Sequence, residues 1–562
     1  MTHRVPSRAR QNRPRIPRLQ CSNPAPETMT PPPTDLALLA EFEPLRRAEL
    51  EIVRAVASGD IAKAGLRRPE SAAAGVGVRG AFLATLLRGA LPLKGRGLEL
   101  VGAFVEGRVD LGHAAIPGSL WFYRCTFDAP VLLDGARVAG AVSFAGCHLS
   151  GLMAEGCAIE GDLELHAGSS VDDEVRLARA RIGGDVDCTR LDLSGHGEAA
   201  AAPRRALVAD AIQVGGDVRL ADGFRAIGEV RLRAARIAGD LRASGNFTGS
   251  RQRDGGRGNA LVLDRLVVGG SVRFDGGFFG AAGGVSLCQA RIAGDLDATG
   301  ASFDRLGDAS LNGDTVLVLD RARVDGSLIL CELQTPLLGA SLVRARVGTL
   351  VDDPTSWGER LALDGFEYSR LGEDSPLDTV FRTDWLERQR PAHLDAQFRM
   401  QPWRRLIRVL RRMGHERHAT NIALRREHRL RAIGWIGASS PPALRWLPRA
   451  GHWLAGLLAG HGYRPARLLG WLAGAWLLGA ALYWAARPRV GAGADVALSP
   501  LAFSLDRLLP WLAPHAPRHW PAGEDWGAAI EWLAYAQSAF GWVALALLLA
   551  SLAGWMDRDR RR

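Results

Sequence analysis

Carboxylates recur at equivalent places in the glycine-rich middle of this 562-residue chain. Gly-Asp turns supply one set, and a second residue follows each of these aspartates two positions later: Asp162, Asp185, Asp217, Asp240 and Asp295, followed by Glu164, Asp187, Arg219, Arg242 and Asp297. Carboxylates on one face of a repeat can form a saccharide-cleaving pair or a calcium site. Recurrence in every repeat favours a structural turn residue, because an active site would make one repeat differ from the others.

A literal G-x-G-x-x-G motif occupies residues 75–80, where Gly75, Gly77 and Gly80 precede a helix-like run. In a dinucleotide-binding site this motif follows a hydrophobic strand, so that the pyrophosphate meets the N-terminus of a helix. Here the preceding residues are RRPESAAA, and no crossover to a second parallel strand follows. We therefore interpret the motif as a loop that enters an N-terminal cap, and we predict no cofactor.

The histidines and cysteines lack the spacing of a metal or nucleophile site. His415 and His418 are three residues apart, whereas a zinc-protease helix needs four, and no serine occupies a G-x-S-x-G frame. The seven cysteines form no C-x-x-C pair, and all but Cys21 lie beside apolar residues, which predicts buried and reduced thiols. The sequence thus indicates no catalytic, cofactor-binding or metal-binding residue.

Arginine is concentrated in one segment. Residues 403–449 contain twelve arginines against Glu416 and Glu427, a local charge of +10 that equals the net charge of the whole chain, and fourteen of the sixteen tryptophans follow position 384. Basic charge combined with tryptophan is typical of a membrane surface. We expect lipid bilayer with anionic headgroups, rather than nucleic acid, to be the partner of these candidate residues: Arg404, Arg405, Arg408, Arg411, Arg412, Arg425, Arg426, Arg429 and Arg431.

The elements that position these residues begin with a short apolar repeat. From about residue 100, segments such as VEGRVDL, APVLLDG and IEGDLEL recur every 10 or 11 residues. Each alternates apolar with small or polar residues and then turns, which is typical of a strand. Two such strands would make a coil of about 22 residues.

Three consecutive 55-residue blocks, 181–235, 236–290 and 291–345, align without a gap and open on RIGGDVDC, RIAGDLRA and RIAGDLDA. Ungapped register of this kind indicates a stacked repeat. Each block holds four strand-like segments and about 11 further residues, which we assign to loops near 192–204, 246–258 and 301–313. The sequence therefore predicts a mainly β protein whose core is a right-handed parallel β-helix with pentapeptide-like repeats and helical caps.

The rest of the chain divides around this repeat region. We expect a disordered basic N-terminus at 1–33, a helical N-terminal cap at 34–97, the repeat β-helix at 98–352, a C-terminal cap at 353–394 and a basic helical hairpin at 395–433. Within the N-terminal cap, an apolar stripe from Leu36 to Val53 predicts one helix, and residues 81–87 predict a second.

Residues 434–562 predict an α-helical membrane region with two spans. Residues 468–486 and 535–556 are apolar and free of charge, and 19 residues at 1.5 Å each span roughly the hydrocarbon thickness. The shorter apolar segment Trp446 to Ala459 predicts a helix in the membrane interface. Between the spans, PLAFSLDRLLPWLAP is consistent with a short amphipathic or a re-entrant element.

Several of these segments together resemble a bacterial family of pentapeptide-like β-helix membrane proteins. The resemblance runs from about residue 35 to the end, on VRGAFLATLLRG, the RIxGDLxA blocks, LVDDPTSW, LDGFEYSRL, QPWRRLIRVLRRMGHERHA, GYRPARLLGWL and FSLDRLLPWL. Members are often described as membrane-associated oxidoreductases, but the family implies no agreed reaction and no redox residue. The hairpin is also similar to a degenerate tetratricopeptide unit, which implies protein binding.

Three functions remain open at this point. We favour a non-catalytic, membrane-anchored scaffold or sensor in the bacterial inner membrane, with an unidentified protein partner and self-association both allowed. The alternatives are an enzyme, either a membrane-associated oxidoreductase or a polysaccharide-active β-helix, and a two-span channel-like protein. By the positive-inside rule, we expect the β-helix and both termini to be cytoplasmic.

Overall fold

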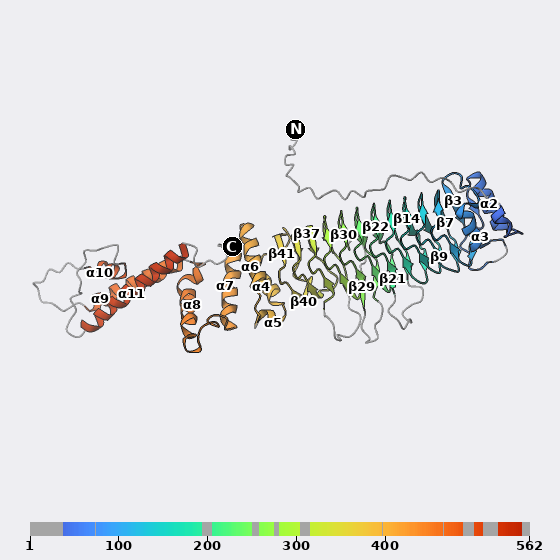
Figure 1. Ribbon diagram of the computed structural model, residues 1–562. Coiled ribbons are helices and arrows are strands. Elements are labelled where there is room, and N and C mark those ends of the chain that lie inside the picture. The colour runs from blue at the N-terminus through green and yellow to red at the C-terminus, as the bar shows by residue number, and fades with distance from the viewer. Residues whose placement is uncertain are drawn as a thin grey trace, which may run out of the picture. The chain divides into compact units, whose positions relative to one another are not determined.

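The computed structural model describes residues 37–72, 75–193, 205–249, 258–274, 280–303, 315–395, 397–464, 466–486, 499–509 and 527–552. The chain forms two compact units, Met1–Ala362 with Gly372–Asp374, and Leu363–Leu371 with Ser375–Arg562. The first unit is a parallel β-solenoid of about 11 turns with helices at its start, and the second is almost entirely helical (Figure 1). The predicted N-terminus 1–33 and most of the predicted loops lie outside the described residues.

Each solenoid turn contains four short strands, not the two that the 10- or 11-residue spacing predicts. One turn consists of β10 (Arg137–Val138), β11 (Val142–Ala145), β12 (His148–Leu149) and β13 (Leu152–Met153), and β14 (Ala158–Ile159) begins the next. Each strand pairs in parallel with its counterparts one turn before and one turn after. Two strands and the corner between them occupy one sequence period, so the apolar pattern resembles that of one longer strand.

The strands form four stacks along the solenoid. The first contains β6 (Ala115–Ile116), β10, β14, β18 (Arg181–Ile182), β22 (Gln213–Val214), β26 (Arg236–Ile237), β30 (Val267–Val268) and β34 (Arg291–Ile292). The second contains β1 (Ala62–Lys63), β3 (Gly97–Val101), β7 (Ser119–Tyr123), β11, β15 (Leu163–His166), β19 (Val186–Asp187), β23 (Val218–Leu220), β27 (Leu241–Ala243), β31 (Val272–Arg273) and β35 (Leu296–Asp297). Two longer strands, β37 (Arg323–Leu330) and β39 (Arg346–Asp352), extend these two stacks.

The other two stacks close the turn. The third contains β2 (Gly77–Arg79), β4 (Phe104–Glu106), β8 (Thr126–Phe127), β12, β16 (Ser170–Val171), β20 (Asp192–Leu193), β24 (Arg225–Ile227), β28 (Asn246–Thr248) and β32 (Gly280–Ala282). The fourth contains β5 (Val109–Asp110), β9 (Val131–Leu132), β13, β17 (Val175–Arg176), β21 (Arg205–Val208), β25 (Glu229–Arg231), β29 (Asn259–Val262), β33 (Gly284–Ser286), β36 (Leu317–Val318), β38 (Leu337–Ser341) and β40 (Trp357–Ala362).

Apolar side chains at equivalent positions of successive turns fill the interior. Ile159, Ile182, Val214 and Ile237 follow one another in register, and each is at most 4% exposed. Neighbouring strands lie about 4.8 Å apart, so these side chains are in van der Waals contact from turn to turn. The repeated apolar positions of the sequence are therefore the core.

Each 55-residue block corresponds to two turns. Arg181, Gln213 and Arg236 occupy the same position in consecutive turns, and the pattern continues through Val267 to Arg291. One turn of each block is longer because it contains a predicted loop. The single turn is thus the smallest segment that stacks in register.

Both ends of the solenoid differ from expectation. The helix predicted from Leu36 to Val53 is divided into α1 (Ala37–Ala40) and α2 (Arg47–Ser58), because Pro44 has no N–H for a helical hydrogen bond and restrains the residue before it. The second predicted helix is α3 (Gly80–Thr85), continued by a π-helical turn, η1 (Leu86–Ala90). At the other end, β40 pairs with β38, so the solenoid extends beyond residue 352, where the sequence predicts the cap.

The second unit begins with β41 (Glu367–Leu371) and continues as helices. These are α4 (Thr379–Glu387), α5 (Pro391–Leu394), α6 (Met400–Arg412), α7 (Glu416–Ala432), η3 (Pro442–Leu444), α8 (Trp446–Ala459), η4 (Gly460–Gly462), α9 (Ala466–Ala485), α10 (Pro500–Leu508) and α11 (Gly527–Leu552). The helix α11 starts at Gly527, not Tyr535, because Ala528, Ala529 and Ile530 continue the helical run past the charge of Glu531.

Candidate functional site: the aspartate ladder and the arginine-rich hairpin

The recurrent aspartates form a ladder that hydrogen-bonds successive turns of the solenoid. Oδ1 of Asp162 accepts the backbone N–H of Asp185 at 2.7 Å, and Oδ1 of Asp185 accepts that of Asp217 at 2.8 Å. The ladder continues through Asp240 to Ser271, whose hydroxyl accepts the backbone N–H of Asp295. Each carboxylate therefore satisfies a backbone donor at the corner between the first and second stacks.

The residue before each aspartate is a glycine for a steric reason. A Cβ on Gly184 would overlap Oδ1 of Asp162, and one on Gly216 would overlap Oδ1 of Asp185. The second carboxylate oxygen is also engaged where Arg219 donates to Asp217 at 3.1 Å and pairs with Asp185 at 3.0 Å. The Gly-Asp repeat is therefore a structural device between turns, as its recurrence in every block predicts.

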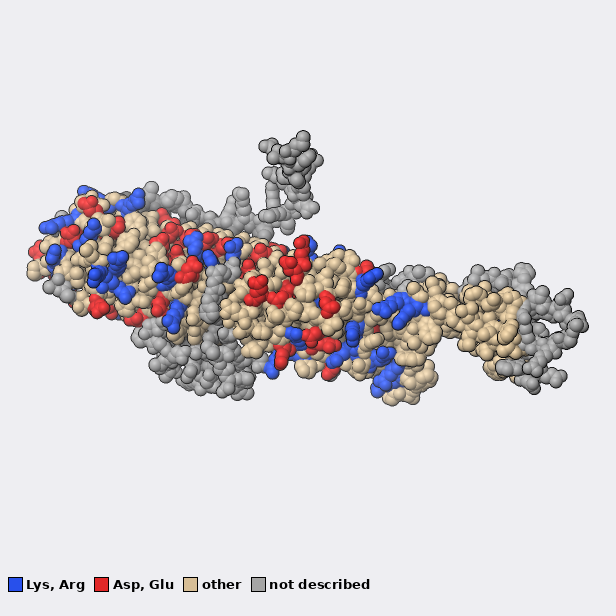
Figure 2. All heavy atoms as spheres, turned by 180° about the vertical axis from the view of Figure 1, so that it is seen from behind, with Lys and Arg blue, Asp and Glu red and all other residues tan. Residues whose placement is uncertain are grey.

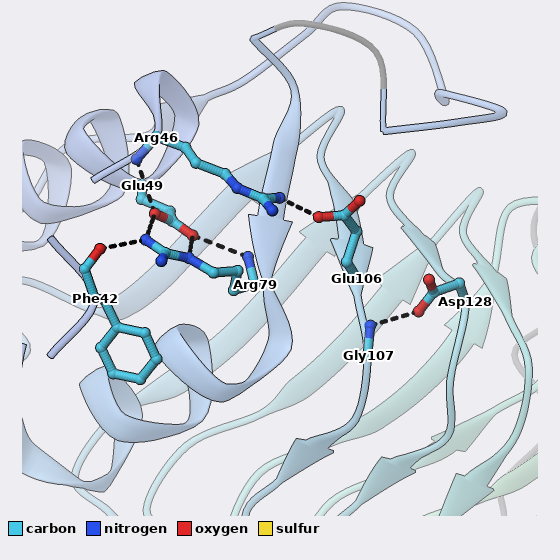
Figure 3. A network of polar contacts seen from close by, with 7 residues as sticks. All are labelled: Phe42, Arg46, Glu49, Arg79, Glu106, Gly107 and Asp128. Atoms are coloured by element: carbon cyan, nitrogen blue, oxygen red, sulfur yellow. Dashed lines mark hydrogen bonds and ion pairs between the residues drawn. The ribbon is translucent and has the colours of Figure 1, made fainter. Parts of the chain in front are cut away.

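The G-x-G-x-x-G segment forms part of the first turns. Residues 77–79 are the strand β2, which pairs with β4, and a Cβ on Gly80 would meet the backbone oxygen of Gly107 at 2.5 Å. Arg79 reaches back to the fully buried Glu49 of α2, donating from Nε at 2.9 Å and from Nη2 at 2.6 Å (Figure 3). The glycines thus allow close backbone packing, and the arginine fastens the cap.

The carboxylate of Glu49 is held by further donors. It accepts the backbone N–H groups of Arg79 at 3.0 Å and of Arg46 at 2.9 Å, while Nη2 of Arg79 also donates to the carbonyl of Phe42 (Figure 3). Burial alone would raise the pKa of Glu49, but the hydrogen bonds and charge of Arg79 outweigh it and lower that pKa. Glu49 is therefore ionised in the folded protein at neutral pH.

The repeat-region cysteines are thiols. Cys125, Cys147, Cys157 and Cys188 are buried, whereas Cys288 and Cys331 are half-buried. Burial raises the pKa of Cys157 to about 12, which keeps that thiol protonated and unreactive. Cys21 lies outside the described residues.

The arginine-rich segment forms the hairpin α6–α7. Trp403, Leu406, Ile407 and Leu410 are buried on α6, as their helical spacing predicts, and Gly414 takes a φ of 84° in the turn. On α7 the buried face consists of Ala419, Ile422, Ala423, Arg426 and Leu430. The two helices therefore pack through their apolar faces.

The candidate arginines divide into two groups. Arg412, Arg425 and Arg431 are exposed, and Arg404 and Arg408 are half-buried. Of the remaining four, Arg405 donates to the carbonyl of Tyr368, Arg411 lies 3.8 Å from Glu416, Arg426 pairs with Glu427, and Arg429 pairs with Asp395. Sequence alone does not separate these groups, because both recur at helical spacing in the same segment.

An ionic cluster between α7, α8 and η4 was not predicted from the sequence. Nη2 of Arg426, a side chain only 3% exposed, donates to Oε1 of Glu427 at 2.9 Å and to the hydroxyl of Tyr463 at 3.0 Å. Oε2 of Glu427 lies 3.2 Å from Nε2 of His452, whose ring centroid is 4.2 Å from that of His461. The only signal in the sequence is an arginine at the centre of the apolar face of α7.

The charges in this cluster are set by their neighbours. Burial would raise the pKa of Glu427, but His452 and Arg426 lower it to about 2. Burial, together with the charge of His452, lowers the pKa of His461 to about 4. At neutral pH the cluster therefore contains an ionised Glu427 and a neutral His461, and it fastens the hairpin to the segment that leads into α9.

In the described part of the chain, no group of three or more His, Cys, Asp or Glu side chains is arranged to hold a metal ion. No protein-family model, curated protein or solved structure matches the chain.

Proposed function

We propose that the protein is a membrane-anchored β-solenoid scaffold that presents a non-catalytic interaction surface to other proteins. The observation that carries the proposal is the surface of α9 and α11. Both helices are long and apolar enough to cross a membrane, and only 22% of the apolar window of α9 and 17% of that of α11 are buried. Figure 2 shows these helices as an almost uncharged surface, in contrast to the mixed charges of the solenoid.

The solenoid supports a scaffold because its repeated polar groups serve the fold. The aspartate ladder joins turn to turn through hydrogen bonds from each carboxylate to a backbone N–H of the next turn. Stacked repeats present an extended surface of regular curvature, which solenoid proteins use for binding partners. The similarity of the hairpin α6–α7 to a degenerate tetratricopeptide unit, which implies protein binding, supports the same function.

The orientation follows from the arginines that flank the two helices. Before α9 lie Arg464, Arg467 and the twelve arginines of 403–449, and after α11 come Arg558 and Arg560 to Arg562. The segment between α9 and α11 contains four arginines, Arg487, Arg489, Arg507 and Arg518, against fourteen before α9 and four after α11. On this arginine count, and by the positive-inside rule, we propose that the solenoid and both termini are cytoplasmic in a bacterial cell.

The first prediction tests anchoring and orientation. We expect the full chain to stay in the membrane fraction after alkaline carbonate, because two apolar spans are not displaced by breaking ionic contacts. A phosphatase inserted between residues 490 and 500 should be active, and a fluorescent protein at the C-terminus should fluoresce. Release by carbonate would contradict anchoring, whereas the reverse reporter pattern would contradict only the orientation.

The second prediction concerns the exposed arginines. Each arginine near an anionic surface contributes about 1 kcal/mol, so R412Q/R425Q/R431Q should lower the preference for anionic over zwitterionic lipid by about tenfold or more. Energy transfer from the tryptophans, which cluster in the second unit, to dansyl-labelled lipids in mixed micelles measures this preference. The preference should also decline with salt, because exposed charges are screened over about 8 Å at physiological ionic strength.

The matched control replaces three exposed arginines of the solenoid, R181Q/R236Q/R291Q, and removes the same charge. These replacements should leave the lipid preference unchanged. An equal loss in both variants would show that net charge, rather than the hairpin, selects the lipid. Stronger binding of DNA than of anionic lipid at the same salt would contradict a lipid-binding hairpin.

A further inference from the structure

The short helix α10, in the segment between the two candidate spans, packs against both of them. Phe503 contacts Tyr483 of α9 edge-on, at a centroid distance of 4.9 Å, and both belong to a buried cluster with Ala486 and Ile530. We propose that α10 is a re-entrant membrane helix, with one face toward α9 and α11 and the other toward the hydrocarbon of the bilayer. This inference rests on the proposed anchoring by α9 and α11.

The depth of α10 follows from a polar network centred on Gln537. Its side chain accepts from the hydroxyl of Tyr483 at 2.9 Å, and it donates to the carbonyl of Ala475 at 2.9 Å and to Oγ of Ser504 at 3.0 Å. Ser504 itself donates to the carbonyl of Trp476 at 2.7 Å. Ala475 and Trp476 lie at the middle of α9, and Gln537 lies near the middle of the apolar window 527–549 of α11. Ser504 is therefore at mid-depth of both spans.

The helix continues inward beyond this point. The carbonyl of Arg507 accepts the hydroxyl of Ser538 at 2.9 Å, and the carbonyl of Leu508 lies so close to Gly541 that a Cβ there would overlap it. Gly541 is fourteen residues beyond the start of α11, a rise of about 21 Å at 1.5 Å per residue. Leu508, at the end of α10, therefore lies well inside the span that α11 begins at Gly527, which is the depth expected of a re-entrant segment.

Protein groups partner backbone groups at both ends of α10. Ser499 caps the N-terminus by accepting from the backbone N–H of Ala502 at 3.5 Å, and Pro500 occupies the first turn, where no N–H is needed. At the C-terminus, the hydroxyl of Ser538 of α11 donates to the carbonyl of Arg507. Backbone groups at membrane depth need such internal partners, because lipid offers none.

The most exposed residues of α10 are apolar, namely Leu501, Ala502 and Leu505, whereas Ser504 and Asp506 are buried and the half-buried Arg507 lies over the ring of Phe503. Leu501 and Leu505 are 47% and 37% exposed, whereas Ser504 is fully buried and Gln537 is 6% exposed. A helix on the surface of a water-soluble protein has the opposite arrangement, with its polar side chains exposed and its apolar side chains buried. Leucines outside and hydrogen-bonded polar residues inside are the arrangement that helices adopt in lipid.

The experiment measures the access of water to α10 in the full chain. In a full chain whose seven native cysteines are replaced by alanine, Leu505→Cys and Ala528→Cys, the latter on the exposed start of α11, are compared in right-side-out and inverted vesicles with a membrane-impermeant maleimide. We expect Ala528→Cys to react from one side and Leu505→Cys to react at least about tenfold less from either side, because lipid excludes the reagent. Reaction of both variants after denaturation in SDS shows that each thiol is competent, and Leu501→Cys repeats the test at a second exposed position.

Two further variants release the helix. Gln537→Leu removes its three hydrogen bonds, and Gly541→Leu displaces Leu508, so either should increase the labelling of Leu505→Cys toward that of Ala528→Cys. Equal labelling of Leu505→Cys and Ala528→Cys in carbonate-resistant protein would overturn the re-entrant helix and leave the anchoring intact. Extraction of the chain by carbonate would instead overturn the anchoring on which the inference rests.

Discussion

Replacing Arg79 by leucine should destabilise the N-terminal cap by about 3–5 kcal/mol, because it leaves the fully buried Glu49 carboxylate without its cation. The two backbone N–H groups that also bind Glu49 remain, but they do not neutralise the charge. Hydrogen exchange of the α2 amides in the full chain measures the effect as faster local opening. The stabilisation should also disappear in acid, because the lowered pKa of Glu49 means that folding favours the ionised form, which is lost as pH falls.

Two variants make this prediction specific. Arg46 pairs with Glu106 on the surface, where their side chains are 42% and 34% exposed, so Arg46→Ala should cost less than about 1 kcal/mol. The double replacement E49L/R79L removes the buried charge together with its partner and should recover most of the lost protection. If Arg79→Leu and Arg46→Ala have equal effects, the buried ion pair does not fasten the cap.

Deleting one complete turn should leave a folded and shorter solenoid, whereas deleting half a turn should unfold the repeat region. Removal of residues 213–235 brings Arg236 into the place of Gln213, where it pairs with Arg181, and Asp240 replaces Asp217 as the donor to Asp185. Solenoid stability is approximately a sum over repeats and their interfaces, so this variant loses only one repeat and one interface.

The matched deletion removes fewer residues and should do more damage. Without residues 224–235, Arg236 follows Gly223 directly. The strand β26, which belongs to the first stack, then occupies the position of β24 in the third stack. The apolar side chains of every later turn then lose their counterparts, because register decides which side chains face the core. Circular dichroism and limited proteolysis of the purified chains distinguish the outcomes, and equal unfolding of both variants would show that the turn is not the stacking unit.

The apolar periodicity determined the solenoid, because side chains that recur at a fixed spacing can be buried only by stacking. The gapless blocks also predicted equivalent positions such as Arg181, Arg236 and Arg291 correctly. The number of strands per turn could not be predicted from the apolar periodicity. A short strand and its corner span about five residues, so one period of 10 or 11 residues contains two strands, and only backbone pairing reveals the corner between them.

Local sequence was also sufficient for the hairpin faces and for the positions of α8 and α9, since helical spacing of apolar residues depends on neighbours three or four positions away. It was not sufficient for the candidate residues. Arg412 and Arg426 are the same residue type in the same segment, yet Arg412 is exposed and Arg426 is buried against Glu427 and Tyr463. That difference depends on Tyr463, 37 positions after Arg426, and only the tertiary structure brings it there.

The sequence by itself therefore determined the repeat, its core positions, the basic hairpin and the two long apolar helices, all of which follow from spacing along the chain. The tertiary structure decided what the polar residues do. The Gly-Asp turns become a ladder because each carboxylate lies opposite a backbone N–H 23, 31 or 32 residues later. Gln537 becomes the centre of a network because α9, α10 and α11 converge on it. Hydrogen bonds are directional and short-ranged, so their partners are set by the packing of distant segments.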